Sequence, residues 1–159
     1  MFLRTLAGTG SAVVATALVG GKASQDVRTG WYRRLSKPAI QPPPVVFPIV
    51  WTALYADVAL SSASTIEAWR SEGKPEQARR FEGALAANLA LNASWTWVFF
   101  RGHRLGPAIA VAGALAASSA DLARRAAPVD RRAAAGLGAY AAWCTFATVL
   151  SAAVWRRNR

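Results

Sequence analysis

Hydrophobic and charged residues are strongly segregated along this chain. Of its 19 basic and eight acidic residues, five long apolar stretches contain only one, Asp57. These stretches cover residues 5–21, 38–66, 83–100, 105–120 and 133–155. An α-helix needs about 17–25 apolar residues to cross the hydrocarbon core of a bilayer, where it satisfies its own backbone hydrogen bonds. The pattern therefore predicts an all-α membrane protein with a bundle of five transmembrane helices.

The charged and proline-rich segments between these stretches predict where the helices begin and end. We expect one domain over residues 1–159, with helices at 5–22, 44–69, 77–101, 105–124 and 131–155. Residues 25–43, called the lid segment below, alternate aromatic and basic residues and end in prolines. Aromatic and basic side chains favour the lipid headgroup region, and proline prevents a regular helix. The lid segment is therefore expected to be an interfacial loop over one end of the bundle.

The first apolar stretch has an alternative interpretation as a cleaved signal peptide. Arg4 precedes it, and Gly21-Lys22-Ala23 has the small residues of a cleavage site. The stretch nevertheless matches the other four in length and in its small residues, which favours a transmembrane helix. Basic residues are divided almost evenly between the two sides of the bundle, so charge does not predict its orientation.

The composition excludes several classes of protein. The chain is 53% hydrophobic and 17% charged, against about 25% charged in ordinary globular chains, so it is not disordered. Its net charge of +11 is carried in short clusters at helix ends, which suits anionic lipid headgroups and predicts no nucleic-acid partner. With His103 as the only histidine and Cys144 as the only cysteine, we predict no metal site and no Ser-His-Asp triad.

Three predicted helices place aromatic and amide side chains on one face, at the i, i+4, i+7 spacing of a helix. The sets are Phe47, Trp51 and Tyr55; Asn88, Asn92, Trp95 and Phe99; and Tyr140, Trp143, Ala147 and Ser151. Amides are costly against lipid, so Asn88 and Asn92 should face the bundle interior. The sequence leaves open whether these faces form an aromatic ligand pocket or pack directly on one another. Tyr140 lies near a span end, where interfacial aromatic belts occur.

Asp57 and a stripe of small residues are two further candidate features. A carboxylate inside a membrane span suggests a proton or cation site, but no basic residue lies in the other spans to pair with it. We therefore favour a hydrogen-bonded carboxyl that faces a neighbouring helix or a wet cavity. The stripe of Gly83, Ala87 and Ala90 permits close helix approach, either in a homodimer or within one bundle.

Three blocks of sequence resemble the TspO/MBR family of tryptophan-rich sensory proteins and translocator proteins. The second block is Asn88-Leu89-Ala90-Leu91-Asn92 with Trp95, and the third is Tyr140 with Trp143, Ala147 and Leu150. The first and longest block contains Trp31-Tyr32, Leu35, Lys37-Pro38, Pro42-Pro43, Phe47-Pro48, Trp51-Thr52 and Leu54-Tyr55.

This resemblance implies a five-helix bundle, often dimeric, whose internal pocket binds tetrapyrroles such as protoporphyrin IX and haem, or sterols in some relatives. Trp51 and Trp143 match tryptophans implicated in light-dependent porphyrin breakdown by bacterial relatives, so they are the candidate catalytic residues. The helix-face pattern adds Trp95 to the positions that match the family pocket. Those positions are Tyr32, Pro42, Trp51, Tyr55, Asn88, Leu91, Asn92, Trp143, Ala147 and Leu150.

The functional prediction is an integral, multi-pass protein of a bacterial membrane that binds porphyrin or haem as a ligand, with no tightly bound cofactor. It would act as a sensor, scavenger or translocator. The alternatives are a porphyrin-oxidising enzyme, or a transporter of a sterol or lipid-like ligand that uses Asp57. Ala39-Ile40 stands where the family usually has an aromatic pair, so the choice of ligand stays open.

Overall fold

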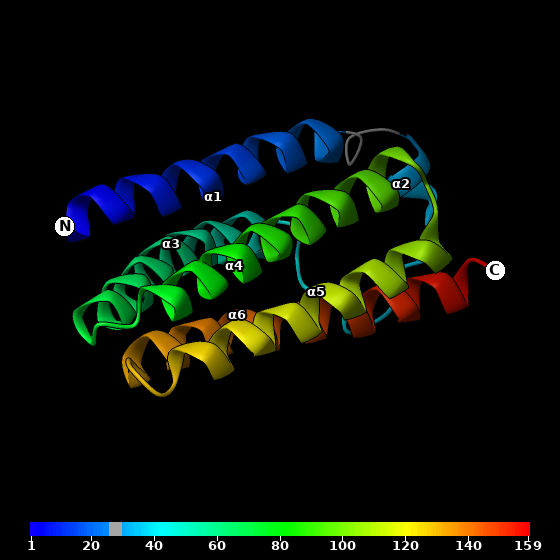
Figure 1. Ribbon diagram of the computed structural model, residues 1–159. Coiled ribbons are helices and arrows are strands. Elements are labelled where there is room, and N and C mark those ends of the chain that lie inside the picture. The colour runs from blue at the N-terminus through cyan, green and yellow to red at the C-terminus, as the bar shows by residue number, and fades with distance from the viewer. Residues whose placement is uncertain (26–29) are drawn as a thin grey trace.

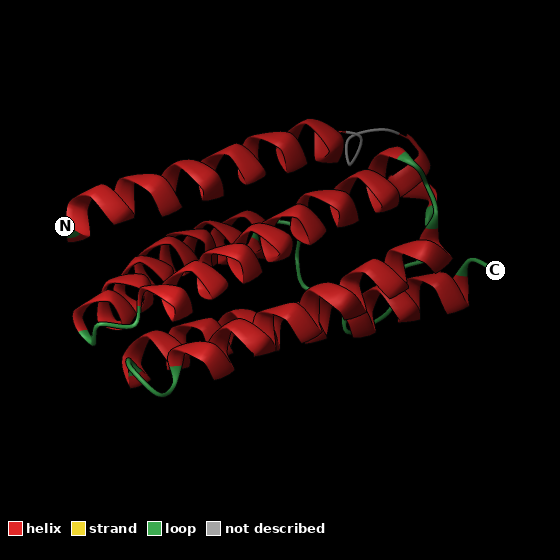
Figure 2. Cartoon of the chain, in the orientation of Figure 1, coloured by secondary structure: helices red, strands yellow, loops and turns green. Residues whose placement is uncertain are grey.

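The computed structural model describes residues 1–25 and 30–159, and these residues form helices joined by short connections (Figures 1 and 2). Residues 26–29, which belong to the predicted lid segment, lie outside the described residues. The π-helix η2 directly continues α4, and the long helices lie side by side in one bundle. The elements are α1 Phe2–Ser24, α2 Gly30–Arg34, α3 Val46–Ser71, α4 Pro75–Thr96, η2 Trp97–Arg101, α5 Leu105–Ala126 and α6 Arg131–Arg157.

The predicted helix boundaries agree with the structure to within about three residues. The second helix begins at Val46 rather than residue 44, and Pro48 lies in its first turn, where proline costs no hydrogen bond. The lid segment is not a loop throughout, because α2 forms one helical turn within it. Lys37 stabilises the end of α2 by donating from Nζ to the backbone oxygens of Tyr32 (3.0 Å) and Leu35 (3.4 Å).

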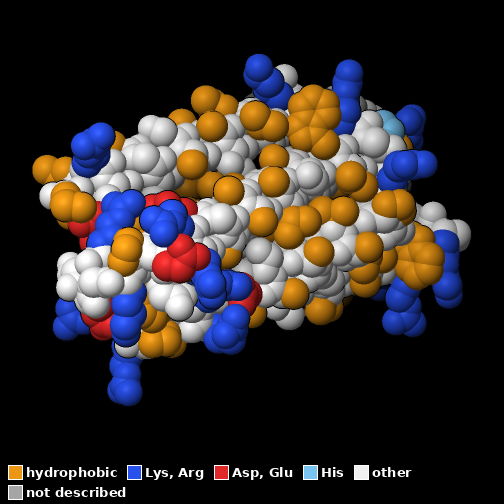
Figure 3. All heavy atoms as spheres, in the orientation of Figure 1, with side chains coloured by type: hydrophobic (Ala, Val, Ile, Leu, Met, Phe, Trp, Pro, Cys, Tyr) orange, Lys and Arg blue, Asp and Glu red, His pale blue; other side chains and the backbone are white. Residues whose placement is uncertain are grey.

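Four helices, α1, α3, α5 and α6, are long and apolar enough to cross a membrane. The first turns of α4 differ, because they carry the ion pairs of Glu76 with Arg79 and Arg80. Charged side chains gather toward the two ends of the bundle, whereas hydrophobic and small uncharged side chains cover its middle (Figure 3). The chain is therefore an integral, multi-pass membrane protein.

Small residues decide how closely some helices approach. On α5, Gly106 faces Trp155 and Gly113 faces Thr148, so α5 packs along α6. The predicted stripe of Gly83, Ala87 and Ala90 lies on the exposed face of α4. A Cβ added at Gly83 would meet no atom within 4 Å, so this face of α4 does not serve packing inside the bundle.

Asp130 caps the N-terminus of α6. Its Oδ1 accepts hydrogen bonds from the backbone N–H groups of Arg132 (3.0 Å) and Ala133 (2.9 Å). Ser64, near the end of α3, donates its hydroxyl to the other carboxylate oxygen. The bond from the Ala133 N–H, followed by that from Ser64, lowers the pKa of Asp130. One carboxylate thus joins two helices at the α5–α6 turn.

Replacing Asp130 by alanine should lower the free energy of unfolding by about 1 kcal/mol, as for other N-cap residues. The measurement is the midpoint of thermal unfolding in detergent, with Asp130→Asn as the control that keeps a cap acceptor. Because folding lowers this pKa, the benefit is present at neutral pH and disappears as the pH falls below about 4. Equal midpoints for wild type and Asp130→Ala at pH 7 would contradict this role.

Candidate functional site

A chain of hydrogen bonds between side chains links α3, α4, α5 and α6 in the centre of the bundle. Tyr55 Oη donates to Asn92 Oδ1 (2.9 Å), and Asn92 Nδ2 donates to Tyr140 Oη (2.9 Å). Tyr140 Oη in turn donates to Asn88 Oδ1 (3.1 Å), and Asn88 Nδ2 donates to Ser119 Oγ (3.0 Å). Both amides therefore have their oxygen and their nitrogen paired, which offsets the cost of burying them.

Trp51 connects this network to a group of aromatic rings. The centre of its ring lies 5.4 Å from that of Tyr55 and 6.4 Å from those of both Tyr140 and Trp143. Trp51 and Trp143 meet nearly at a right angle, with 84° between their planes. Phe47 approaches Trp143 from α3 at 6.1 Å. The two candidate catalytic tryptophans, from α3 and α6, are thus in edge-to-face contact, a favourable ring geometry.

A second group of rings lies under the lid segment. The ring of Tyr32 on α2 is 5.6 Å from Phe100, and that of Trp31 is 6.2 Å from Phe99. Trp95 on α4 packs against Phe99 at 5.5 Å. Burial among these rings raises the pKa of Tyr32, an effect partly opposed by the hydrogen bond from Gln41. The lid segment is therefore packed onto the end of α4 and η2.

The π-helix η2 is a feature that the sequence pattern did not predict. An α-helix would place position 99, but not position 100, next to Trp95. The wider i→i+5 turn brings Phe100 to 5.8 Å from Trp95 while Phe99 stays at 5.5 Å. Gly102 ends this turn, and a Cβ there would lie 2.9 Å from the Val98 backbone oxygen. Short π-helices are frequent at functional sites.

Two further contacts hold the lid segment in place. The backbone N–H of Ser36 donates to Asn158 Oδ1 (2.9 Å), and Asn158 Nδ2 donates back to the Ser36 oxygen (3.0 Å). Trp31 stacks on His103, with ring centres 4.0 Å apart. The lid segment is thus fastened both to the C-terminal tail and to the turn before α5.

Most of the predicted ligand-binding residues fall into these two groups. The central group contains Trp51, Tyr55, Asn88, Leu91, Asn92 and Trp143. The group under the lid segment contains Tyr32, Trp95 and Leu150. Pro42 and Ala147 are half-buried, and neither side chain takes part in the contacts described above.

Tyr140 is the residue of the network for which the sequence left two interpretations open. It shares the predicted inward face with Trp143, but it also lies near a span end, where interfacial belts occur. Its side chain is 0% exposed and joins both amides, so the inward placement is correct. The signal for this placement is its position three residues before Trp143, on the same helix face. The serine at the far end of the network, Ser119, carried no comparable signal, because a serine in a small-residue helix is common.

Asp57 faces α6 rather than lipid. Ser61 donates its hydroxyl to Asp57 Oδ1 (3.0 Å), and this oxygen lies so close to Gly136 that a Cβ there would be 2.3 Å away. The other oxygen, Oδ2, is buried and has no hydrogen-bond partner among the described residues. The expectation of a hydrogen-bonded carboxyl facing a neighbouring helix agrees with this geometry.

Two indole N–H groups in the site have no hydrogen-bond acceptor among the described residues. The Nε1 atoms of Trp95 and Trp143 are buried and donate to no acceptor among the described residues. A buried donor without an acceptor is unfavourable, so a carbonyl or carboxylate oxygen of a ligand would stabilise it. The arrangement therefore combines flat aromatic surface with two free donors, which suits a large planar ligand that carries oxygen acceptors.

One family model and several known proteins are similar to this chain. The model of the TspO/MBR family matches residues 9–156. A translocator protein of Sus scrofa is 33% identical over 133 residues, which cover 81% of this chain and 75% of that protein. A tryptophan-rich sensory protein of Cereibacter sphaeroides is 40% identical over 111 residues, or 70% of this chain and 61% of that protein. The protein CrtK of Rhodobacter capsulatus is 31% identical over 91% of this chain and 89% of its own length.

Proposed function

Because the chain belongs to the TspO/MBR family, we propose that it binds porphyrin-type tetrapyrroles, such as protoporphyrin IX and haem, inside the bundle. It would act as a sensor, scavenger or translocator of these molecules. The observation that carries the proposal is the contact of Trp51 with Trp143 beside the paired amides, where the Trp143 N–H has no acceptor among the described residues. Indole rings pack well on a flat macrocycle.

The lid segment would provide the positive charge that pairs with the carboxylates of a porphyrin. Porphyrin carboxylates stay near the membrane surface, and Arg33 and Arg34 are exposed on α2 at that end of the bundle. Guanidinium groups bind carboxylates through paired hydrogen bonds. The rings of Trp31 and Tyr32 pack against Phe99 and Phe100, so a ligand that enters from this end would have to displace them.

We also propose that α4 and η2 together form the fifth transmembrane segment. Residues 83–100 are uncharged, and the pairs of Glu76 with Arg79 and Arg80 lie beyond them at the bundle end. The exposed stripe of Gly83, Ala87 and Ala90 on the same helix is the proposed contact of a homodimer, since small residues permit close helix approach.

The direct test is titration of the detergent-purified protein with protoporphyrin IX in the dark, followed by tryptophan fluorescence. We expect saturable quenching, because the ligand would lie against Trp51 and Trp143. Replacing either residue by phenylalanine should reduce quenching while keeping most of the affinity, since a flat ring remains. Trp97→Phe is the matched control, because Trp97 is 43% exposed on the outside of the bundle. Quenching that does not saturate would contradict the proposal.

The tryptophan contact also favours a second candidate function, light-dependent porphyrin breakdown. An indole in contact with an excited macrocycle can exchange electrons with it, so Trp51→Phe and Trp143→Phe should slow bleaching under illumination more than they weaken binding. The measurement is the loss of the porphyrin absorption band, again with Trp97→Phe as control. Many bleached porphyrins per protein would identify an enzyme, whereas binding without bleaching would leave a sensor or carrier.

A further inference from the structure

A groove of about 640 Å³ runs between α1, α3 and α4, at the end of the bundle away from the lid segment. Its length is lined by small and apolar side chains: Gly8 and Ala12 of α1, Ile66 of α3, and Ala86 and Leu89 of α4. A Cβ added at Gly8 would meet no atom within 4 Å, so the missing side chain keeps this part of the groove open. The groove shares no residue with the proposed porphyrin site.

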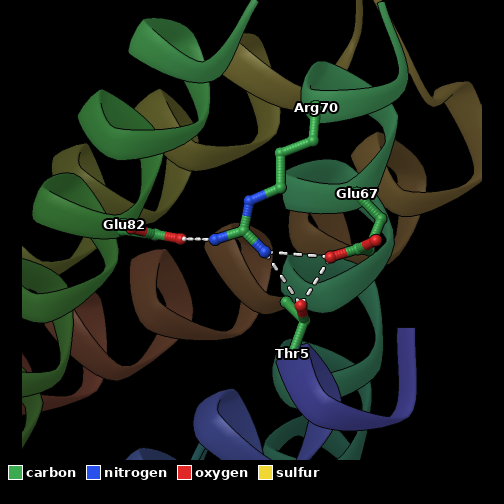
Figure 4. Close-up of polar contacts among 4 residues, drawn as sticks. All are labelled: Thr5, Glu67, Arg70 and Glu82. Carbon is green, nitrogen blue, oxygen red and sulfur yellow. Dashed lines mark hydrogen bonds and ion pairs between the residues drawn. The ribbon is translucent and has the colours of Figure 1, made fainter. Parts of the chain in front are cut away.

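The groove is polar where it meets the end of the bundle (Figure 4). Arg70 of α3 donates from Nη2 to Glu82 Oε1 of α4 (2.7 Å), and from Nη1 to both Glu67 Oε1 (2.9 Å) and Thr5 Oγ1 (3.0 Å). Thr5 of α1 donates its hydroxyl to the same oxygen of Glu67. These bonds hold the three helices together at this point, and they use only one oxygen of each carboxylate.

Two groups at the groove remain available to a ligand. The Glu82 side chain is 41% exposed, and its second oxygen accepts no hydrogen bond from the described residues. Arg4 of α1 is exposed, and its guanidinium makes no ion pair or hydrogen bond with the described residues. The groove therefore presents the Arg4 guanidinium and one Glu82 oxygen, both without a partner among the described residues, beside its apolar lining.

We propose that this groove binds one phospholipid with an ethanolamine headgroup. Its acyl chain would lie along Gly8 and Ala12, its phosphate would accept hydrogen bonds from Arg4, and its ammonium would donate to the free oxygen of Glu82. Charge-assisted bonds of this kind are the strong ones. A choline headgroup has no N–H to donate, and a glycerol headgroup brings no cation to Glu82. A second copy of the chain has eight acidic residues but a net charge of +11, so it complements Arg4 less well than a phosphate does.

The test is native mass spectrometry of the purified protein with added lipids of identical acyl chains. We expect one phosphatidylethanolamine to bind about tenfold more tightly than phosphatidylcholine, which corresponds to about 1.4 kcal/mol. Arg4→Ala should weaken the binding of all phospholipids, because it removes the contact with the phosphate. Glu82→Gln, which can still accept from Arg70, should remove the preference for ethanolamine. Gly8→Phe should block the channel, with Gly8→Leu as a milder replacement.

The matched controls are Lys22→Ala, which removes a cation at the other end of α1, and Gly21→Phe, which adds a ring to an exposed position of α1 that does not line the groove. Both should bind phosphatidylethanolamine as the wild type does. Thermal unfolding midpoints are measured for every variant, and Arg4→Ala, at an exposed position, should keep that of the wild type. Equal affinity for the three headgroups, or unchanged binding by Arg4→Ala and both Gly8 variants, would overturn the proposal. The proposal would also be overturned if the wild type formed a dimer without bound lipid and Gly8→Phe separated its subunits, because the groove would then hold a second copy of the chain.

Discussion

Replacing Gly136 by alanine is expected to destabilise the bundle by about 1–3 kcal/mol, the usual cost of a methyl group placed where no space exists. A Cβ at position 136 would lie 2.3 Å from Oδ1 and 2.9 Å from Cγ of Asp57. The carboxylate cannot easily move away, because Ser61 holds Oδ1 and Oδ2 is buried. The measurement is the unfolding midpoint as sodium dodecyl sulfate is added to the detergent-purified protein.

Two further variants separate the clash from other effects of the substitution. Gly138→Ala is the matched control on α6, because a Cβ there would meet nothing within 4 Å. Alanine favours helix over glycine by about 1 kcal/mol, so this variant should be as stable as the wild type or more stable. Removing the carboxylate in Asp57→Ala should rescue Gly136→Ala, with a coupling of about 0.5–3 kcal/mol. Equal behaviour of the two glycine variants would show that α3 and α6 are farther apart.

Replacing Tyr140 by phenylalanine is expected to lower the free energy of unfolding about as much as Gly136→Ala does, because it removes hydrogen bonds. The change removes one oxygen and leaves Asn92 Nδ2 and Asn88 Oδ1 unpaired. An unpaired buried group costs about 1–3 kcal/mol, whereas side-chain hydrogen bonds between membrane helices average about 0.6 kcal/mol. We expect the upper part of this range, because both amides are at most 2% exposed and neither can turn toward water.

The same variant should weaken porphyrin binding. Tyr140 packs against Trp51 and orients both amides, so its loss should disturb the ring surface offered to the ligand. Tyr55→Phe is the matched control, because it leaves only Asn92 Oδ1 unpaired, at the outer end of the network. The readouts are the unfolding midpoint and the quenching titration. A larger effect of Tyr55→Phe than of Tyr140→Phe would show that Tyr140 is not the centre of the network.

Much of the fold and part of the site could be predicted from the sequence alone. The apolar stretches, in which Asp57 is the one charged residue, located the long helices, because a charged residue at the centre of a membrane span is costly. The amide positions Asn88 and Asn92 were correctly placed inside, for the same reason. The prediction was wrong for the lid segment as a continuous loop, and it missed η2. Both involve a single helical turn that depends on residues far apart in the sequence, because Trp31 of α2 packs against Phe99 of η2.

The sequence by itself determined that the helices lie in a membrane, how long they are, and which faces of three helices point inward. These properties depend on which residues lie near one another along the chain. Only the tertiary structure decided that Tyr140 joins Asn88 to Asn92, that Trp51 touches Trp143, and that Gly136 makes room for Asp57. Each of these contacts joins residues 48 or more positions apart, the nearest pair being Asn92 and Tyr140. Helical periodicity specifies a face but not the partner across from it, and the partner depends on how whole helices rotate and slide as they pack.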